Sequence, residues 1–264
     1  MKLRLLTRRP PPLSPASCAI SLIGASLLAD TRLPSSRLWS LTHLRFSAGE
    51  HIDYSCFPVL PTAVTADILI ACSSRPSTSS SEDLIVVENV DERYARTGFT
   101  PRKDEAGKWQ LDVDRHKGGW VNFVKAGFCG VLEDHLPSSA DPKPMAADLL
   151  YTGSVPDGAG LSSSAAMVVG STLAFLVLNG KADLVDSGGL VRMAVANERV
   201  VGVNSGGMDQ AASVLSTASS ALLIDFWPQL EAKEVPVPKT ARFVISVRRD
   251  LLLLALRLAR SGQG

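Results

Sequence analysis

The sequence has few cysteines, and none of them lie close together. Its four cysteines are scattered, so neither a zinc-binding C-x-x-C pair nor a dense disulfide framework is expected. Free thiols in a reducing compartment are the default for such a pattern, which favours a cytoplasmic protein. The four histidines are also dispersed, and only His51 and Asp53 place two potential ligands near each other.

Long apolar runs and an excess of one charge are also missing. No apolar run reaches the roughly 18 residues needed to span a bilayer. The 27 basic and 26 acidic side chains give a net charge of +1, so neither a nucleic-acid partner nor a membrane partner is expected. A chain of 264 residues with 45% hydrophobic residues can bury a core in one large or two modest domains, and we expect a monomer.

The two ends of the chain differ from its middle. The first 49 residues hold seven Lys or Arg against one acid, as in an organellar transit peptide, but prolines at 10–12 interrupt any amphipathic helix. A disordered or aberrant extension over 1–48 is therefore favoured. The tail over 247–264, with four consecutive leucines, is also predicted to be aberrant. The domain is expected over 49–246.

Within that domain the apolar pattern predicts a mixture of strands and helices. The β-branched runs at 62–72 and 83–90 flank a serine-rich turn, which predicts a hairpin. The other predicted elements are helices at 119–132, 165–178 and 190–201, and strands at 148–155, 220–226 and 242–246. Because the two kinds of element do not alternate regularly, the predicted fold class is α+β.

A glycine- and serine-rich loop between the strand at 148–155 and the helix at 165–178 is the strongest chemical feature. Gly158 and Gly160 let the backbone turn tightly and approach a ligand. The following helix points its unpaired N–H groups at the loop, which suits phosphate oxygens. The loop is no Walker A motif, and Ser163 stands where a dinucleotide fingerprint needs its third glycine. An ordinary strand–helix turn with an N-cap is the alternative.

Three other features carry polar side chains. Paired glycines at 206 and 207 precede Asp209, which could orient or deprotonate a hydroxyl or simply cap a helix. The run at 49–54 (GEHIDY) suits a polyhydroxy ligand, although such runs usually lie on solvated loops. Glu198 is a candidate Mg²⁺ carboxylate, with an exposed helical glutamate as the alternative.

The motifs occur together in the order found in one family. Residues 156–166 (PDGAGLSSSAA) resemble the phosphate loop of the GHMP small-molecule kinases. Residues 49–61 (GEHIDYSCFPVLP) resemble the galactokinase signature, and 201–214 (VGVNSGGMDQAASV) resemble its substrate and base segment. The run at 120–125 (WVNFVK) is similar to the family's tryptophan-bearing helix. The resemblance covers about 49–246 and is strongest to fungal-type galactokinases.

This resemblance implies a GHMP-kinase N-terminal domain, with the ribosomal protein S5 domain 2-like fold, that phosphorylates galactose at its anomeric hydroxyl with ATP and Mg²⁺. Asp209 would be the catalytic base, and Ser164 and Glu198 would hold Mg²⁺. The residues implied to hold galactose are Glu50, His51, Asp53, Gly206 and Gly207. The residues implied to hold ATP are Trp120, Gly158, Gly160, Leu161, Ser162, Ser163 and Ser164.

The sequence departs from the family pattern at both ends of the match. The family's arginine before the signature falls on Leu44, and Arg45 would face the other side of a strand. The match stops after Ser246, where the family continues into a second domain, so that domain is predicted to be missing and the gene product truncated or mis-predicted. N-acetylgalactosamine kinase and a non-catalytic galactose- and ATP-binding sensor remain alternatives. The intact serine run at 162–164 favours a kinase lineage.

Overall fold

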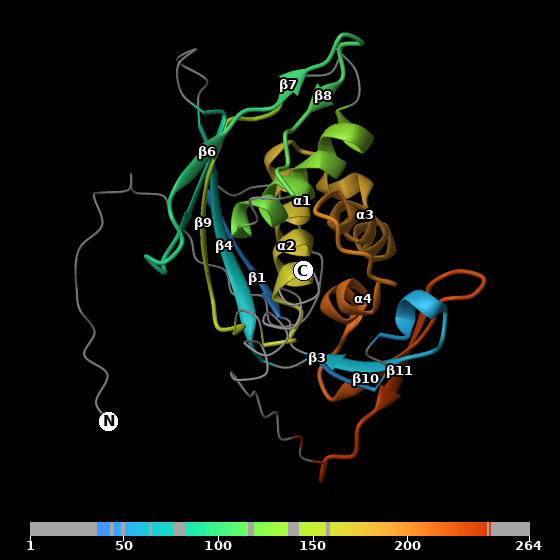
Figure 1. The fold of residues 1–264 in the computed structure, drawn as a ribbon. Helices are drawn as coiled ribbons and strands as arrows, with labels where there is room; N and C mark the ends of the chain where they lie inside the picture. Colours follow the sequence, from blue (N-terminus) through green and yellow to red (C-terminus); the bar gives the residue numbers. More distant parts are fainter. Residues whose placement is uncertain are drawn as a thin grey trace, which may run out of the picture.

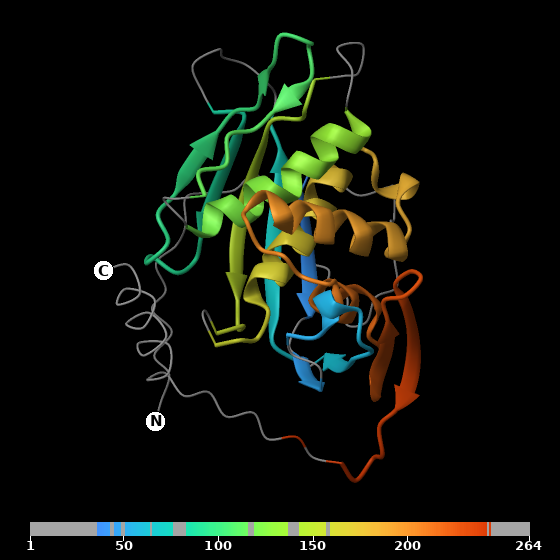
Figure 2. The ribbon, with the colours of Figure 1, turned by 45° about the vertical axis from the view of Figure 1, so that its right-hand side comes forward.

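The fold is built on a five-stranded sheet with helices on one face (Figures 1 and 2). The computed structural model describes residues 36–42, 45–48, 51–63, 65–75, 83–115, 119–136, 143–156, 159–241 and 243. The strand order is β1 (Ser36–Thr42), β4 (Asp67–Ser74), β9 (Ala147–Gly153), β5 (Ile85–Asn89) and β6 (Thr97–Phe99). Only the β5–β9 pair is parallel; the other three pairs of this sheet are antiparallel.

Alternation along the central strands gives the sheet one apolar and one polar face. On β4 the buried side chains are Ile68, Ile70 and Cys72, and on β9 they are Ala147, Leu149 and Tyr151. A strand with this period buries one face and leaves the other to solvent. The helices α1 (Trp120–His135) and α2 (Ser163–Leu178) lie on the apolar face.

The α2 helix is buried on most sides because α1, α3 (Ser187–Val200) and α4 (Met208–Leu215) pack against it. Gly127 lets α1 and α2 approach closely, since a Cβ at this position would lie 2.8 Å from the backbone nitrogen of Thr172. Next to it, the rings of Phe128 and Phe175 stack with centroids 4.1 Å apart. The core thus fixes the position of the N-terminus of α2.

Two short hairpin-like sheets lie below the helices in Figure 1. They pair β2 (Arg45–Ala48) with β3 (Leu60–Ala63), and β10 (Ser220–Asp225) with β11 (Glu231–Pro236). Val59 and Ile224 join them through two backbone hydrogen bonds of 3.0 and 2.9 Å. The remaining elements are the strands β7 (Arg102–Lys103) and β8 (Trp109–Gln110) and the 3₁₀ helices η1 (Asp53–Ser55) and η2 (Ala182–Leu184).

The structure confirms the α+β class, the three predicted helices and the strands predicted at 148–155 and 220–226. The strand predicted at 242–246 falls outside the described residues. No described helix has both the length and the apolar character needed to cross a bilayer. The helix α4 and the strand β11 were not predicted, because short segments of small or charged residues carry little periodic signal.

The predicted hairpin between 62–72 and 83–90 is wrong. These residues form β3, β4 and β5, and β9 lies between β4 and β5 in the sheet. The serine-rich segment does not join two paired strands, because β4 and β5 each pair with β9, which comes from a later part of the chain. Strands β1 and β2, which precede the predicted domain start at residue 49, pair with β4 and β3.

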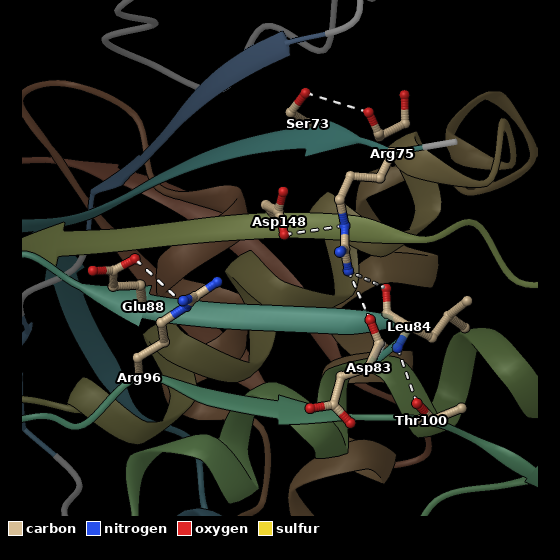
Figure 3. A network of polar contacts seen from close by, with 9 residues as sticks. Ser73, Arg75, Asp83, Leu84, Glu88, Arg96, Thr100 and Asp148 are labelled. Carbon is tan, nitrogen blue, oxygen red and sulfur yellow. Dashed lines mark hydrogen bonds and ion pairs between the residues drawn. The ribbon is translucent and has the colours of Figure 1, made fainter. Parts of the chain in front are cut away.

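Arg75 connects three strands on the polar face of the sheet (Figure 3). Its Nε lies 3.2 Å from Asp148 Oδ1, and its Nη2 donates to the carbonyl oxygens of Asp83 and Leu84 at 2.7 and 3.4 Å. The Arg75 side chain is 25% exposed, so these charge-assisted contacts are only partly screened. They hold the end of β4 to β9 and to the start of β5.

We expect Arg75→Ala to lower the free energy of unfolding by about 1–2 kcal/mol, because charged donors to carbonyl groups contribute more than neutral donors. The control is Arg96→Ala on the same face. Arg96 pairs with Glu88 at 4.0 Å, with side chains 67% and 59% exposed, so its loss should change the free energy by less than about 0.5 kcal/mol. Urea unfolding measures both, and equal losses would contradict the role of Arg75.

Candidate active site

The predicted phosphate loop leads into α2 at the end of the sheet where β9 ends (Figure 1). Gly160 has φ +70°, and a Cβ there would meet nothing within 4 Å, so the backbone lies open at this position. Ser162 is the N-cap of α2 in the left-handed conformation, with φ 58°. Asp157 and Gly158 lie outside the described residues.

Among the described residues, no side chain caps the N-terminus of α2. Ser162 Oγ makes no capping bond, and it is buried without a hydrogen-bond partner among the described residues. The first amides of α2, including those of Ser163 and Ser164, therefore remain available to an external acceptor. Leu161 is 8% exposed and belongs to the core, so its side chain anchors the loop and only its backbone could meet a ligand. This geometry suits an anion.

A second part of the site joins two segments that are distant in sequence. Asp53, at the start of η1, is 6% exposed, and its Oδ2 accepts a 2.9 Å hydrogen bond from the Gly206 amide 153 positions away. Gly206 lies against the η1 backbone, since a Cβ there would be 2.4 Å from the Asp53 carbonyl carbon. The predicted sugar residues Asp53 and Gly206 are thus in direct contact.

The neighbouring predicted residues lie around this contact. Gly207 is the N-cap of α4 with φ +106°, a value that glycine adopts readily. Asp209 lies in the first turn of α4 and is half-buried. His51 is exposed in the turn before η1, with φ 64°. Glu50 lies outside the described residues.

Glu198 is buried, not an exposed helical residue. It lies on α3, is 1% exposed and accepts a hydrogen bond from Gln210 Nε2. A buried carboxylate needs hydrogen-bond or charge partners. Mg²⁺ is usually held by one or two carboxylates together with phosphates and water. Within the described part of the chain, no group of three or more His, Cys, Asp and Glu side chains could hold a metal ion.

A surface pocket of about 630 Å³ lies beside the Asp53–Gly206 contact. Its walls are η1, the outer face of α3, residues 204–206 and the loop after β10. The charged, aromatic and thiol side chains that line it are Asp53, Tyr54, Cys56, Arg192, Arg199 and Phe226. Asp209, Glu198, Trp120 and the serines at 162–164 do not line it. The pocket therefore shares one wall with the predicted sugar residues but lacks the predicted base.

Trp120 begins α1 and is half-buried. Its ring makes edge contacts with Tyr94 and Tyr151, at centroid distances of 6.0 and 5.4 Å. Burial raises the pKa of the Tyr151 hydroxyl well above its usual range, and this hydroxyl lies 2.9 Å from Ser171 Oγ. Trp120 is thus held by aromatic neighbours that the sequence did not reveal, since they come from distant segments.

The thiols differ sharply in environment. Cys56 is exposed in the pocket wall, whereas burial, with a smaller contribution from Glu133, raises the pKa of Cys129 to about 12. In a Cys18→Ser background, we expect a disulfide reagent at pH 8 to modify Cys56 in the folded protein and to reach Cys129 only in denaturant, because the thiolate is the reactive form.

A Cys56→Ser variant is the control for this labelling and should lose the rapid phase. Cys72, also buried, should behave like Cys129. Release of more than one equivalent of reagent product before unfolding would contradict the described burial.

Family models and known proteins match the chain over this site. The model "GHMP kinases N terminal domain" matches residues 122–217, and the model "Galactokinase galactose-binding signature" matches 48–74. The galactokinase of Candida parapsilosis is 38% identical over 199 residues, which is 75% of this chain and 37% of the relative. The galactokinase of Candida maltosa is 36% identical over 176 residues, 67% of this chain and 76% of the relative.

Solved structures agree on the fold. The Lactococcus lactis galactokinase complexed with galactose superposes with a TM-score of 0.60 at 21% identity, over 84% of this chain and 56% of that one. The Methanococcus jannaschii mevalonate kinase superposes with a TM-score of 0.54 at 16% identity, over 71% of this chain and 53% of that one. The chain spans about 37% of the length of the Candida parapsilosis and Dictyostelium discoideum galactokinases. By its sequence, the chain belongs to the galactokinase family of the GHMP kinases.

Proposed function

We propose that this site binds galactose and ATP and transfers the γ-phosphoryl group to the anomeric hydroxyl of the sugar. The observation that carries the proposal is the 2.9 Å contact between the Gly206 amide and Asp53. It joins the matched galactose-binding signature to the loop that precedes Asp209. The choice of galactose as the sugar is supported by the galactokinases to which the chain is similar.

The sugar would lie against η1 and the 204–207 loop. Asp53 accepts the Gly206 amide through one oxygen and has a second oxygen for a sugar hydroxyl, as suits a polyhydroxy ligand. His51 and the backbone of Gly206 and Gly207 would complete the contacts, together with the predicted residue Glu50. A glycine at 206 lets this loop lie directly on the η1 backbone, because a Cβ would overlap Asp53 and Tyr54 backbone atoms.

The nucleotide would lie at the N-terminus of α2. Hydrogen-bond donors for phosphate oxygens would come from the amides of Ser163 and Ser164, the Ser162 hydroxyl and the exposed backbone of Gly160. The predicted residue Gly158 belongs to the same loop, and Leu161 fixes the loop to the core. Trp120 would lie near the adenine ring.

Ser164 and the buried Glu198 would hold Mg²⁺. When bound, this ion neutralises the negative charge that the phosphate oxygens carry during transfer. Glu198 suits the role because it is already a hydrogen-bonded carboxylate on a rigid helix.

Asp209 would act as the base. The anomeric hydroxyl of galactose gives its proton to the Asp209 carboxylate while its oxygen forms a bond to the γ-phosphorus, and the bond from that phosphorus to ADP breaks. The first turn of α4 holds Asp209 three positions after Gly206, so the base follows the sugar wall directly. Most of the rate enhancement in such reactions comes from positioning and charge neutralisation.

The proposal also covers the domain bounds, the cellular compartment and the partners of the chain. We place the chain in the cytoplasm as a monomer with neither a nucleic-acid nor a membrane partner, on its balanced charge and scattered thiols. The domain would run from residue 49 to residue 246, and β1, which precedes it, pairs with β4 inside it. Residues 1–35 and 247–264 lie outside the description.

Calorimetry and a coupled ADP-release assay test this function on the purified, folded chain. We expect saturable binding of galactose and of MgATP, and ADP release that depends on galactose. N-acetylgalactosamine is the matched competitor, and we expect a lower kcat/KM with it. A folded sample that does not bind galactose would refute the proposal.

A further inference from the structure

Gln210 lies at the centre of a buried chain of polar groups. It follows Asp209 on α4 and is 0% exposed. Its Nε2 donates to Glu198 Oε2 on α3, and its Oε1 accepts a 3.0 Å hydrogen bond from the Ser205 hydroxyl. One amide therefore links the candidate metal carboxylate to the loop before α4.

The same chain continues to the sugar wall. Ser205 is followed by Gly206, whose amide donates to Asp53 Oδ2 at 2.9 Å. Gly206 also lies directly against η1, since a Cβ on it would be 2.4 Å from the Asp53 carbonyl carbon. A displacement of Glu198 is thus carried by hydrogen bonds and close packing to Asp53 in the pocket wall.

Only a neutral amide of this length fits the chain. The Gln210 side chain presents a donor to a carboxylate at one atom and an acceptor to a hydroxyl at the other. A glutamate would place a second carboxylate beside Glu198, and a methionine would leave both neighbours without their partner. The Gln210 amide thus uses its oxygen for Ser205 and its nitrogen for Glu198.

We propose that Gln210 is a positioning residue that couples the Glu198 carboxylate to residues 204–206, so that Mg²⁺-nucleotide and galactose strengthen each other's binding. This inference rests on the proposed function, since it takes Glu198 as a metal ligand and Asp53 as a sugar ligand. The coupling is reciprocal: each ligand raises the affinity for the other by the same factor. Gln210 itself touches neither ligand.

The test is a set of calorimetric titrations with the full chain. Galactose is titrated with and without a saturating non-hydrolysable ATP analogue and Mg²⁺, and the ratio of the two dissociation constants gives the coupling factor. We expect about 5- to 50-fold for the unmodified chain, within the usual range for coupled sites. In Gln210→Met we expect the factor to fall to within about twofold of one.

Two further variants separate coupling from stability. Ser205→Ala removes the hydrogen bond from Ser205 to Gln210 but leaves Glu198 unchanged, so it should also lower the coupling factor. If Gln210→Met fails to fold, the coupling factor of Ser205→Ala tests the inference. Gln229→Met is the matched control, because Gln229 is exposed and bonds only Glu231 in the described network, at 3.1 Å; it should keep the full factor.

The outcomes distinguish this inference from the proposed function. If the unmodified chain binds both ligands and the Ser205→Ala and Gln210→Met variants keep the full coupling factor, Gln210 has a purely structural role and the inference is wrong. The same holds if the unmodified chain binds both ligands with a factor of one. If the chain binds no galactose at all, the proposed function itself fails.

Discussion

Gly206→Ala is expected to weaken galactose binding by more than tenfold and to lower the free energy of unfolding by about 1–3 kcal/mol. The new methyl group would lie 2.4 Å from the Asp53 carbonyl carbon, 2.6 Å from its oxygen and 2.7 Å from the Tyr54 nitrogen. All three are backbone atoms, so no side-chain rotation can relieve the overlap. The 204–207 loop and η1 must separate, which removes the hydrogen bond to Asp53 and deforms the proposed sugar wall.

Calorimetry and urea unfolding measure these two effects. Gly188→Ala is the control, because a Cβ there would meet only side-chain ends, those of Arg192 at 3.3 Å and of Asp186 at 3.8 Å. Alanine is also favoured over glycine in a helix, so Gly188→Ala should be neutral or slightly stabilising. If Gly206→Ala bound galactose as tightly as the unmodified chain, the sugar could not lie against this wall.

Asp209→Asn should lower kcat by a factor of about 10²–10⁴, the usual contribution of a positioned base. Asparagine keeps the shape of the side chain but cannot take the proton of the anomeric hydroxyl. The first turn of α4 and its contacts remain, so the KM for galactose should change by less than about tenfold. The coupled ADP-release assay gives both constants.

Asp225→Asn provides the control for this prediction. Asp225 ends β10, is exposed and stands outside the proposed site, so its substitution should leave kcat and KM as they are. Should Asp209→Asn turn over galactose at the unmodified rate, the base is a different group.

The helices α1, α2 and α3 were predicted because each is long enough to show its apolar pattern, whereas the short α4 was missed. α2 is buried along almost its whole length, and this continuous apolar run is visible without any tertiary information. The strand β9 was also predicted, yet its place in the sheet was not. Its partners β4 and β5 come from distant parts of the chain, and pairing of this kind is fixed by the shared apolar face.

The candidate site could be predicted only in part. Motif resemblance indicated Asp53, Gly206 and Asp209 as one group, and the structure places Asp53 against Gly206. The burial of Glu198 was not predictable, because a glutamate on a helix is usually exposed. Gln210 gave no signal at all: a polar residue in a short helix shows its role only when its two partners, from α3 and from the preceding loop, are seen beside it.

Hydrogen–deuterium exchange with and without ligands tests the central claim most directly, since it reports where each ligand contacts the backbone. Galactose is predicted to slow exchange in peptides covering 51–56 and 204–209, and a Mg²⁺-bound ATP analogue should slow it in peptides covering 159–166. Protection by both ligands in other segments, with exchange in these three unchanged, would contradict the account.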